Sequence, residues 1–263
     1  MSTAKHCTIR LDDAGSTPGA NAAILKILRQ GLVPNASVMM PCAWAEAFLA
    51  EAKGLSHACL GLHLTMNNEW IEPAWGPLLD EQAVPSLHST TGRFAKDGNV
   101  HVVDGATTAD LMKEAEAQLQ AMRGFGVEPD YVDSHMGFEW AFEGGVEAIK
   151  DWCQKIGIPW CDDLPVAKTS DRYGPGVNHD LDAMLDALPT QGPPPLVFYH
   201  PAESSDPVAA GLTIRDQDEQ ADASWHGQTR QDDVDFLTGK TLREAIEDGR
   251  LVVHRVPDAL QRL

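Results

Sequence analysis

The stretch CTIRLDDAGSTP, residues 7–18, joins a short strand to a helix through two adjacent aspartates. Residues 7–11 are the strand candidate. Ser16-Thr17-Pro18 is typical of a helix start, because a hydroxyl caps the first turn and proline suits the first helical position. A strand that leads directly into a helix is the unit from which parallel sheets with outer helices are built.

The same alternation continues along the chain. Further strands are predicted at 36–40, 58–64, 131–133, 159–161, 196–200 and 251–255, and helices at 21–30, 43–53, 108–122, 145–156, 179–188, 232–237 and 242–247. This pattern predicts one α/β domain over residues 1–263, an irregular (β/α) barrel with about seven strands. A doubly wound open sheet is the alternative. The segment 65–104 is long and rich in turn residues, and such loops are usually functional.

Composition and net charge exclude several classes of binding partner. The 263 residues include 20 Lys and Arg against 39 Asp and Glu, a net charge of −19. This balance argues against nucleic-acid and anionic-membrane partners, because phosphate contacts need clustered basic residues. No stretch approaches the ~20 apolar residues of a membrane span, and the amino-terminal residues contain no export signal. We therefore expect a cytoplasmic protein with a small-molecule substrate; homo-oligomers are common and one is possible here.

Polar side chains follow the predicted strands where each strand ends. They are Asp12 and Asp13, His63, His135 and His200. Functional groups gather at the carboxyl ends of parallel strands, so these five are expected to meet. One carboxylate and two imidazoles suit a divalent ion such as zinc, which activates water, and a second carboxylate can take the proton. Each residue alone has a plainer interpretation: Asp-Asp also occurs at 162–163 and 232–233, and a lone His63 in an apolar strand is more often structural.

These residues resemble the YdjC-like carbohydrate deacetylase family. The family carries Asn-Ala-Asp-Asp-Phe-Gly, then Gly-(Leu/Val)-His-Leu-Thr, then His-Leu-Asp-Ser-His, then His-Pro-Gly. The counterparts here are residues 10–15, 61–65, 131–135 and 200–202, in the same order. The resemblance implies a polysaccharide-deacetylase-like barrel, one divalent metal ion (zinc, with magnesium as the alternative) and hydrolysis of an N-acetyl group on an amino sugar or short oligosaccharide.

The resemblance also implies roles for the five residues. Asp13, His63 and His135 correspond to the metal ligands, Asp12 to the general base and His200 to the general acid. Trp70 and Trp75 lie in the long segment after the third strand, where an indole face can pack on a sugar ring. A hydrophobic cluster within that segment is an equal explanation for both.

The chain departs from the family pattern at several positions. Asn-Ala is replaced by Arg10-Leu11, the position two residues after His135 is Gly137, and the late glycine is Ala202. These changes leave the residues that correspond to the metal ligands intact. They weaken the inference that this chain acts on the same substrate as other members of the family. Two other functions stay open: a metal-dependent amidohydrolase or esterase on a non-sugar acyl group, and a catalytically silent metal- and carbohydrate-binding protein.

Overall fold

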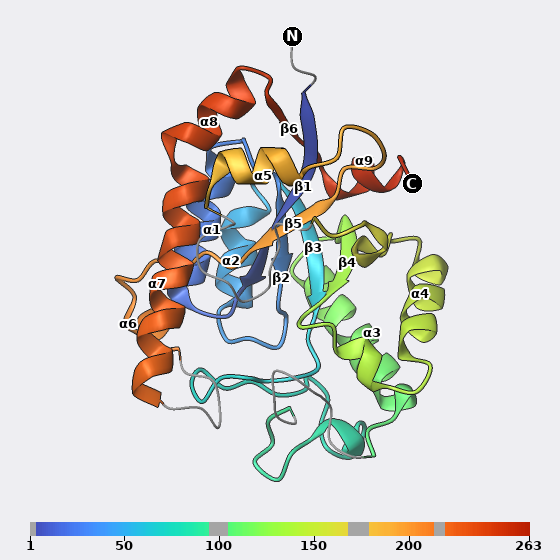
Figure 1. Cartoon of the computed structure of the whole chain (residues 1–263). Helices are drawn as coiled ribbons and strands as arrows, with labels where there is room; N and C mark the ends of the chain where they lie inside the picture. The colour runs from blue at the N-terminus through green and yellow to red at the C-terminus, as the bar shows by residue number, and fades with distance from the viewer. Residues whose placement is uncertain (1–3, 95–104, 168–178, 213–218) are drawn as a thin grey trace.

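The computed structural model describes residues 4–94, 105–167, 179–212 and 219–263, with the side chains of 219–226 excepted. Its centre is a curled parallel sheet in the order β4-β3-β2-β1-β5, with β6 paired to β1. The strands are β1 (Lys5–Ala14), β2 (Asn35–Val38), β3 (Cys59–Leu64), β4 (Tyr131–Ser134), β5 (Leu196–Tyr199) and β6 (Leu251–Val253). Figure 1 shows these strands surrounded by helices.

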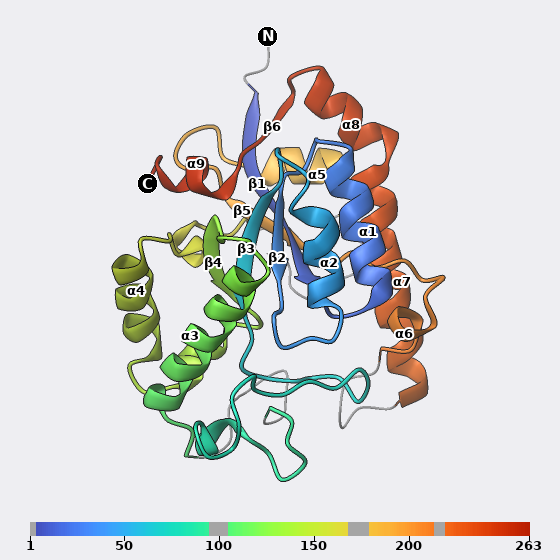
Figure 2. The same cartoon turned by 180° about the vertical axis from the view of Figure 1, so that it is seen from behind.

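Helices connect and cover the strands, as the alternation in sequence predicts. They are α1 (Pro18–Arg29), α2 (Ala45–Ala52), α3 (Thr108–Gly124), α4 (Gly145–Ile156), α5 (Leu181–Ala187), α6 (Pro207–Ala210), α7 (Glu219–Thr238), α8 (Lys240–Glu247) and α9 (Val256–Leu260), with 3-10 turns η1 (Pro85–Leu87), η2 (Phe138–Ala141) and η3 (Cys161–Asp163). Thr17 caps α1 and Pro18 occupies its first turn, as predicted. Figure 2 shows α1 and α2 side by side on one flank of the sheet, and α3 and α4 on the other. No helix among the described residues is both long and apolar enough to cross a bilayer.

The sheet has six strands in the described residues, whereas about seven were predicted. The prediction of a strand at 159–161 is wrong, because this segment makes only one parallel bridge, from Trp160 to Val132, before turning into η3. Val166 then makes a second parallel bridge to Leu196 on β5. Residues 160–166 therefore make one bridge to each edge strand, β4 and β5, but form no regular ladder with either. Because no hydrogen-bonded strand closes the curled sheet, it is a half-barrel.

β1 is the central strand of the sheet and pairs with three others, β2, β5 and β6. Its first residues pair with β6, residues 8–11 pair with β5, and its other edge pairs with β2. The register with β2 shifts between Leu11 and Ala14, which brackets Asp12 and Asp13. Asp13 has a φ of 67°, a left-handed conformation that aspartate adopts more readily than most residues. Such irregularities redirect side chains, and both aspartates line the same pocket instead of alternating across the strand.

The segment that follows β3 runs across the carboxyl ends of the strands (Figure 1). Its beginning is held to α3: Gln118 accepts a hydrogen bond from the Thr65 backbone N–H at 3.0 Å and donates one to the Thr65 carbonyl at 2.7 Å. The Thr65 hydroxyl donates to the carbonyl of His63 at 2.8 Å. The backbone that presents His63 is therefore fixed from both sides.

Close packing between β3 and β4 yields a prediction about stability. Gly61 lies opposite Tyr131, and a Cβ at position 61 would overlap the tyrosine ring. The ring is fully buried and its hydroxyl is held 2.9 Å from the Ser37 hydroxyl, so it has no room to move away. We expect Gly61→Ala to lower the free energy of unfolding by about 1–3 kcal/mol, measured by urea denaturation.

Gly124, at the end of α3, is the matched control because a Cβ there meets nothing within 4 Å. Gly124→Ala should leave stability unchanged or slightly raised, because alanine favours helix. Equal stability of the two variants would contradict the packing argument.

Candidate metal and catalytic site

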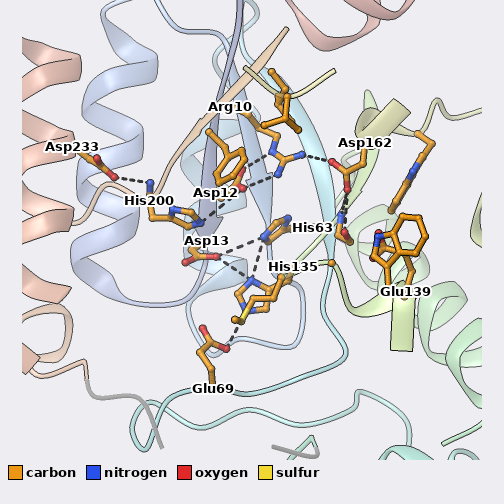
Figure 3. A pocket seen from close by; sticks show the side chains of 18 of the residues that line it. Arg10, Asp12, Asp13, His63, Glu69, His135, Glu139, Asp162, His200 and Asp233 are labelled. Atoms are coloured by element: carbon orange, nitrogen blue, oxygen red, sulfur yellow. Dashed lines mark hydrogen bonds and ion pairs between the residues drawn. The ribbon is translucent and has the colours of Figure 1, made fainter. Parts of the chain in front are cut away.

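The structure brings the five predicted polar residues together at the carboxyl ends of the strands (Figure 3). Asp12 and Asp13 end β1, His63 lies on β3, and His135 and His200 directly follow β4 and β5. The Asp13 Oδ1 atom lies 3.3 Å from His135 Nδ1 and 3.6 Å from His63 Nε2. Four of the side chains are buried, and the His200 side chain is 37% exposed at the solvent edge.

The cluster of Asp13, His63 and His135, hereafter the triad, has donor atoms suited to a cation. One atom from each residue lies within 4.8 Å of the other two. Asp13 Oδ1 is buried and has no hydrogen-bond partner in the structure. Buried polar atoms normally have a partner, and two imidazoles with one carboxylate are typical divalent-metal ligands. The residues present therefore fit a metal ion.

A second group, Asp12, His63 and Asp133, also has three potential ligands close together. Asp133 Oδ1 is buried without a hydrogen-bond partner, as Asp13 Oδ1 is, but the other carboxylate oxygens of this group are bound to Arg10. Arg10 binds both oxygens of Asp12 at 2.6 and 2.8 Å, and the Asp133 Oδ2 atom lies 2.9 Å from Arg10 Nη1 and 3.0 Å from His63 Nδ1. A cation there would compete with a guanidinium, so the triad is the better site.

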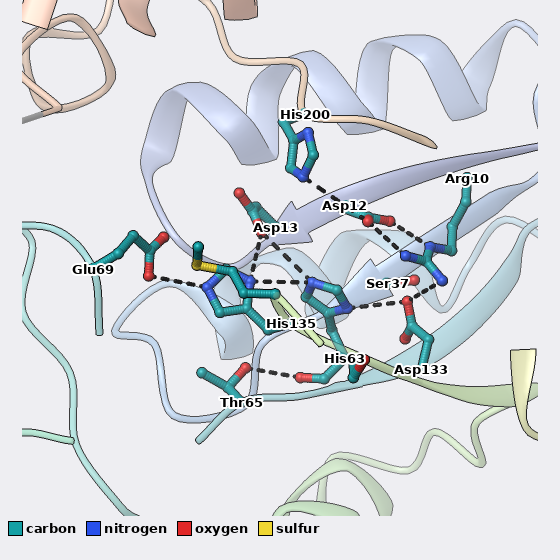
Figure 4. A network of polar contacts seen from close by, with 12 residues as sticks. Arg10, Asp12, Asp13, Ser37, His63, Thr65, Glu69, Asp133, His135 and His200 are labelled. Atoms are coloured by element: carbon teal, nitrogen blue, oxygen red, sulfur yellow. Dashed lines mark hydrogen bonds and ion pairs between the residues drawn. The ribbon is translucent and has the colours of Figure 1, made fainter. Parts of the chain in front are cut away.

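Each imidazole of the triad has a carboxylate behind it (Figure 4). His63 Nδ1 contacts Asp133 at 3.0 Å, and His135 Nε2 contacts Glu69 at 3.0 Å. When each ring is neutral, the carboxylate at one nitrogen fixes the proton there, and the other nitrogen, which lies 3.3 Å from its counterpart on the second imidazole, offers its lone pair to a metal ion. His63 would thus bind through Nε2 and His135 through Nδ1.

Two arginines hold the two aspartates separately. Arg10 donates two hydrogen bonds to the Asp12 carboxylate, and Arg230 from α7 contacts Asp13 Oδ2 at 2.9 Å. Arg230 also donates to the His200 carbonyl at 3.3 Å, and its guanidinium carbon lies 5.4 Å from the centre of the Trp70 ring. Paired bonds from a planar guanidinium fix a carboxylate in orientation as well as in charge. The arginines therefore keep the adjacent carboxylates in different positions.

Charge in the site favours a cation between the triad residues. Burial disfavours ionisation of Asp13, but Arg230 and the nearby imidazoles hold the pKa of this carboxyl well below its usual range. Burial would lower the pKa of His63, yet Asp133 and Asp13 raise it to about 10. The pKa of His135 rises in the same way to about 9, through Glu69 and Asp13. Positive charge is therefore stabilised where the three donor atoms meet.

His200 is held through its backbone. Its N–H donates to Asp233 Oδ2 at 2.8 Å, and the other oxygen of Asp233 lies 2.7 Å from His179 Nε2. The His200 ring remains free to face Asp12, with Nε2 4.0 Å from Asp12 Oδ2. The carboxylate and the imidazole thus lie on one side of the triad.

The two predicted substrate-binding tryptophans are both buried, at 4% and 5% exposure. Trp70 lines the pocket, with Arg230 over its ring. Trp75 lies outside the pocket lining, and its indole N–H donates to the Asn67 carbonyl at 2.7 Å. For Trp75 the structure thus favours the hydrophobic-cluster interpretation.

Sequence reasoning missed several residues that surround the site. They are Arg10, Glu69, Asp133, Arg230 and Asp233. Arg10 carried a signal, because a buried arginine in an apolar strand beside two aspartates needs several anionic partners. Asp162, in one of the other Asp-Asp pairs, accepts hydrogen bonds from Arg10 at 2.9 Å and from the Ser134 hydroxyl at 3.0 Å. Glu69 and Arg230 had no local signal.

The half-barrel and its strand-end cluster place the chain among α/β proteins with a site at the carboxyl end of the sheet. The YdjC-like protein family model matches residues 7–248, so the chain belongs to this family, which confirms the resemblance in its motifs. A carbohydrate deacetylase from Geobacillus stearothermophilus is 27% identical over 95% of this chain and 97% of its own length. Another from Thermus thermophilus is 26% identical over 89% and 92%.

One solved structure shares the fold over nearly its whole length. A protein from Enterococcus faecalis V583, described as a candidate cellobiose-phosphate cleavage protein, superposes with a TM-score of 0.77. It is 19% identical, and the match covers 97% of this chain and 99% of that one. The whole half-barrel is therefore shared, including the strands that carry the triad.

The contact between Glu69 and His135 yields a prediction about metal binding. We expect Glu69→Ala to weaken divalent-metal affinity by roughly 10–100-fold, because the imidazole loses the partner that fixes its proton and its orientation. Titration calorimetry with Zn²⁺ measures the change. Glu69→Gln retains an oxygen acceptor and should lose less affinity.

Glu72→Ala is the control, since Glu72 is an exposed acid in the same segment, 3.1 Å from Arg93. It should bind the metal like the unmodified protein. Unchanged affinity in Glu69→Ala would refute the supporting role of Glu69.

Proposed function

We propose that this protein is a metal-dependent hydrolase that removes an N-acetyl group from an amino sugar or a short oligosaccharide. The observation that carries the proposal is the unpartnered, buried Asp13 oxygen, which faces two imidazole nitrogens beside an Asp12–His200 pair. Membership of the YdjC-like family and the similarity to two carbohydrate deacetylases support the choice of a sugar substrate.

Asp13, His63 and His135 would hold the metal ion. Two nitrogen ligands and one oxygen ligand suit zinc, with magnesium as the alternative. When bound, such an ion lowers the pKa of water and polarises a carbonyl group. Arg230 occupies the second oxygen of Asp13, so this carboxylate offers the ion one oxygen only. Asp13, His63 and His135 are the three protein ligands that the ion would have here.

Asp12 is the general base in this mechanism. Arg10 occupies one side of each Asp12 oxygen, and each oxygen has a further lone pair that can accept a proton from water. The same two hydrogen bonds from Arg10 keep the Asp12 carboxylate from rotating toward the triad. Asp12 thus takes protons while Asp13 binds the ion, and the separation rests on their arginine partners.

His200 is the general acid. Its ring is close to Asp12 and partly open to solvent, so it can deliver a proton to the leaving nitrogen and be reprotonated afterwards. Asp233 and Arg230 fix the backbone on both sides of its Cα through the N–H and the carbonyl. The ring therefore keeps its place while the proton moves.

Replacement of the base tests this assignment. Asp12→Asn should lower kcat by roughly 10²–10⁴-fold and leave the bound metal in place, because Asp12 is not a ligand. Acetate release from N-acetylglucosamine and chitooligosaccharides, together with metal analysis, measures both effects. The exposed Asp186 on α5 supplies the control variant Asp186→Asn, which should behave like the unmodified enzyme. Normal turnover in Asp12→Asn would refute the base.

Removal of the acid has a different signature. His200→Ala should slow acetate release by roughly 10²–10⁴-fold, with a smaller loss on activated aryl amides, whose leaving groups need less protonation. Equal losses on both kinds of substrate would contradict the acid role.

The same substrates distinguish the two alternative functions. Release of acetate from simple esters and amides, but from no acetylated sugar, would indicate that the substrate is a non-sugar acyl compound. Metal and sugar binding without any acetate release would identify a silent binding protein.

A further inference from the structure

The carboxylate of Asp233 connects His200 to a histidine outside the catalytic pocket. Among the described residues, each Asp233 oxygen has one hydrogen-bonding partner: Oδ2 accepts from the His200 N–H at 2.8 Å, and Oδ1 lies 2.7 Å from His179 Nε2. The Asp233 side chain is 9% exposed and the His179 side chain 21%. The link therefore runs from the backbone of the proposed acid, through a buried carboxylate, to an imidazole nearer the surface.

Local structure fixes both ends of this link. Asp233 lies three residues after Arg230 on α7, and residues three apart share a helix face. Both side chains therefore reach the His200 backbone, and Figure 3 shows the contact from Asp233. At the other end, the Asp180 side chain caps α5, and this cap places His179 directly before the helix.

Aromatic rings pack around His179. Its ring centre lies 6.4 Å from that of Tyr199, the residue before His200, and 5.9 Å from that of Phe236 on α7. The rings of Tyr199 and Phe236 stack on each other at 5.7 Å. The hydrogen bond to Asp233 raises the pKa of His179, which favours a positively charged ring beside the carboxylate. His179 thus contacts both the strand that leads to His200 and the helix that carries Asp233.

The Asp233 carboxylate depends on its partners because it is buried. An ionised carboxylate that loses a partner in such a place has an uncompensated desolvation cost. Without His179, Asp233 would therefore turn toward water or take up a proton. Either change would weaken the hydrogen bond that holds the His200 N–H, since bonds to a charged acceptor are the stronger ones. The His200 ring would then move relative to Asp12, which lies 4.0 Å away.

We propose that His179 is a positioning residue for the general acid His200 and that it acts through the Asp233 carboxylate. This inference rests on the proposed function, because it assumes that His200 delivers a proton to the leaving nitrogen. His179 lies outside the lining of the catalytic pocket, so it touches neither the substrate nor the reacting atoms. Its loss should slow proton delivery and leave metal binding and substrate binding unchanged.

Two substitutions at position 179 separate the hydrogen bond from the ring packing. His179→Gln retains an N–H donor for Asp233 and should keep most of kcat. His179→Phe retains a ring against Tyr199 and Phe236 but donates no hydrogen bond. It should lower kcat by roughly 10–100-fold, as a small displacement of a reacting group does, with little change in KM. Acetate release from chitooligosaccharides measures both variants. Normal kcat in His179→Phe, or an equal loss in the two variants, would overturn the proposal.

A double-mutant comparison tests whether His179 acts through His200. His179→Phe should slow the unmodified protein but cause no further loss in His200→Ala, where the group to be positioned is absent. The loss in His179→Phe should also be smaller on activated aryl amides, because these leaving groups need less protonation. Equal fold-losses from His179→Phe in the two backgrounds would indicate a general structural effect and would overturn the proposal.

His57→Phe is the matched control, since His57 is exposed, lies outside the pocket lining and binds the Leu28 carbonyl. It should keep the kcat and the metal content of the unmodified protein. His179→Phe should keep the metal content too, and a loss of metal there would show a disturbed triad and overturn the proposal. Absence of acetate release by the unmodified protein from every acetylated sugar would instead contradict the proposed function, and this inference with it.

Discussion

Two neighbouring buried carboxylates constrain the whole site. Asp12 and Asp13 follow each other in the chain and both are 2% exposed, so their charges repel at short range in a medium that screens poorly. Arg10 binds one and Arg230 the other, and the register shift with a left-handed Asp13 directs them differently. In the proposed mechanism one carboxylate takes a proton and the other binds a cation. That division depends on two guanidiniums that come from opposite ends of the chain.

The same arginines connect the site to the rest of the fold. Arg10 also contacts Asp133 and Asp162, so it joins β1 to the end of β4 across the inside of the half-barrel. Arg230 joins α7 to β1 and to the backbone of His200. A buried arginine with fewer partners would carry a large desolvation cost, which explains why three carboxylates surround Arg10. The departure from the family pattern at position 10 is therefore built into the surrounding structure.

Much of the fold was predictable because strands and helices have different apolar spacing and clear start signals. Thr17 and Pro18 start α1 as predicted, and the predicted helix at 145–156 coincides with α4. The strand predicted at 159–161 was wrong because short apolar runs are compatible with several conformations. In the structure this segment makes a single bridge, at Trp160, and no ladder of strand hydrogen bonds. Among the site residues, His63 and His135 were predictable from their position at strand ends. Glu69 was not, since its partner is 66 residues away in the chain.

The sequence by itself determined most of the order of strands and helices, with 159–161 as the exception, the five polar residues at the strand ends and the family. Each of these features depends on a local sequence pattern, so each can be predicted from a short segment without knowledge of the rest of the fold. Only the tertiary structure decided which carboxylate lies behind each imidazole, which arginine holds each aspartate, and that Trp75 is covered while Trp140 is exposed. Such contacts join residues far apart in the chain, and their geometry follows from the curl of the sheet rather than from any local preference.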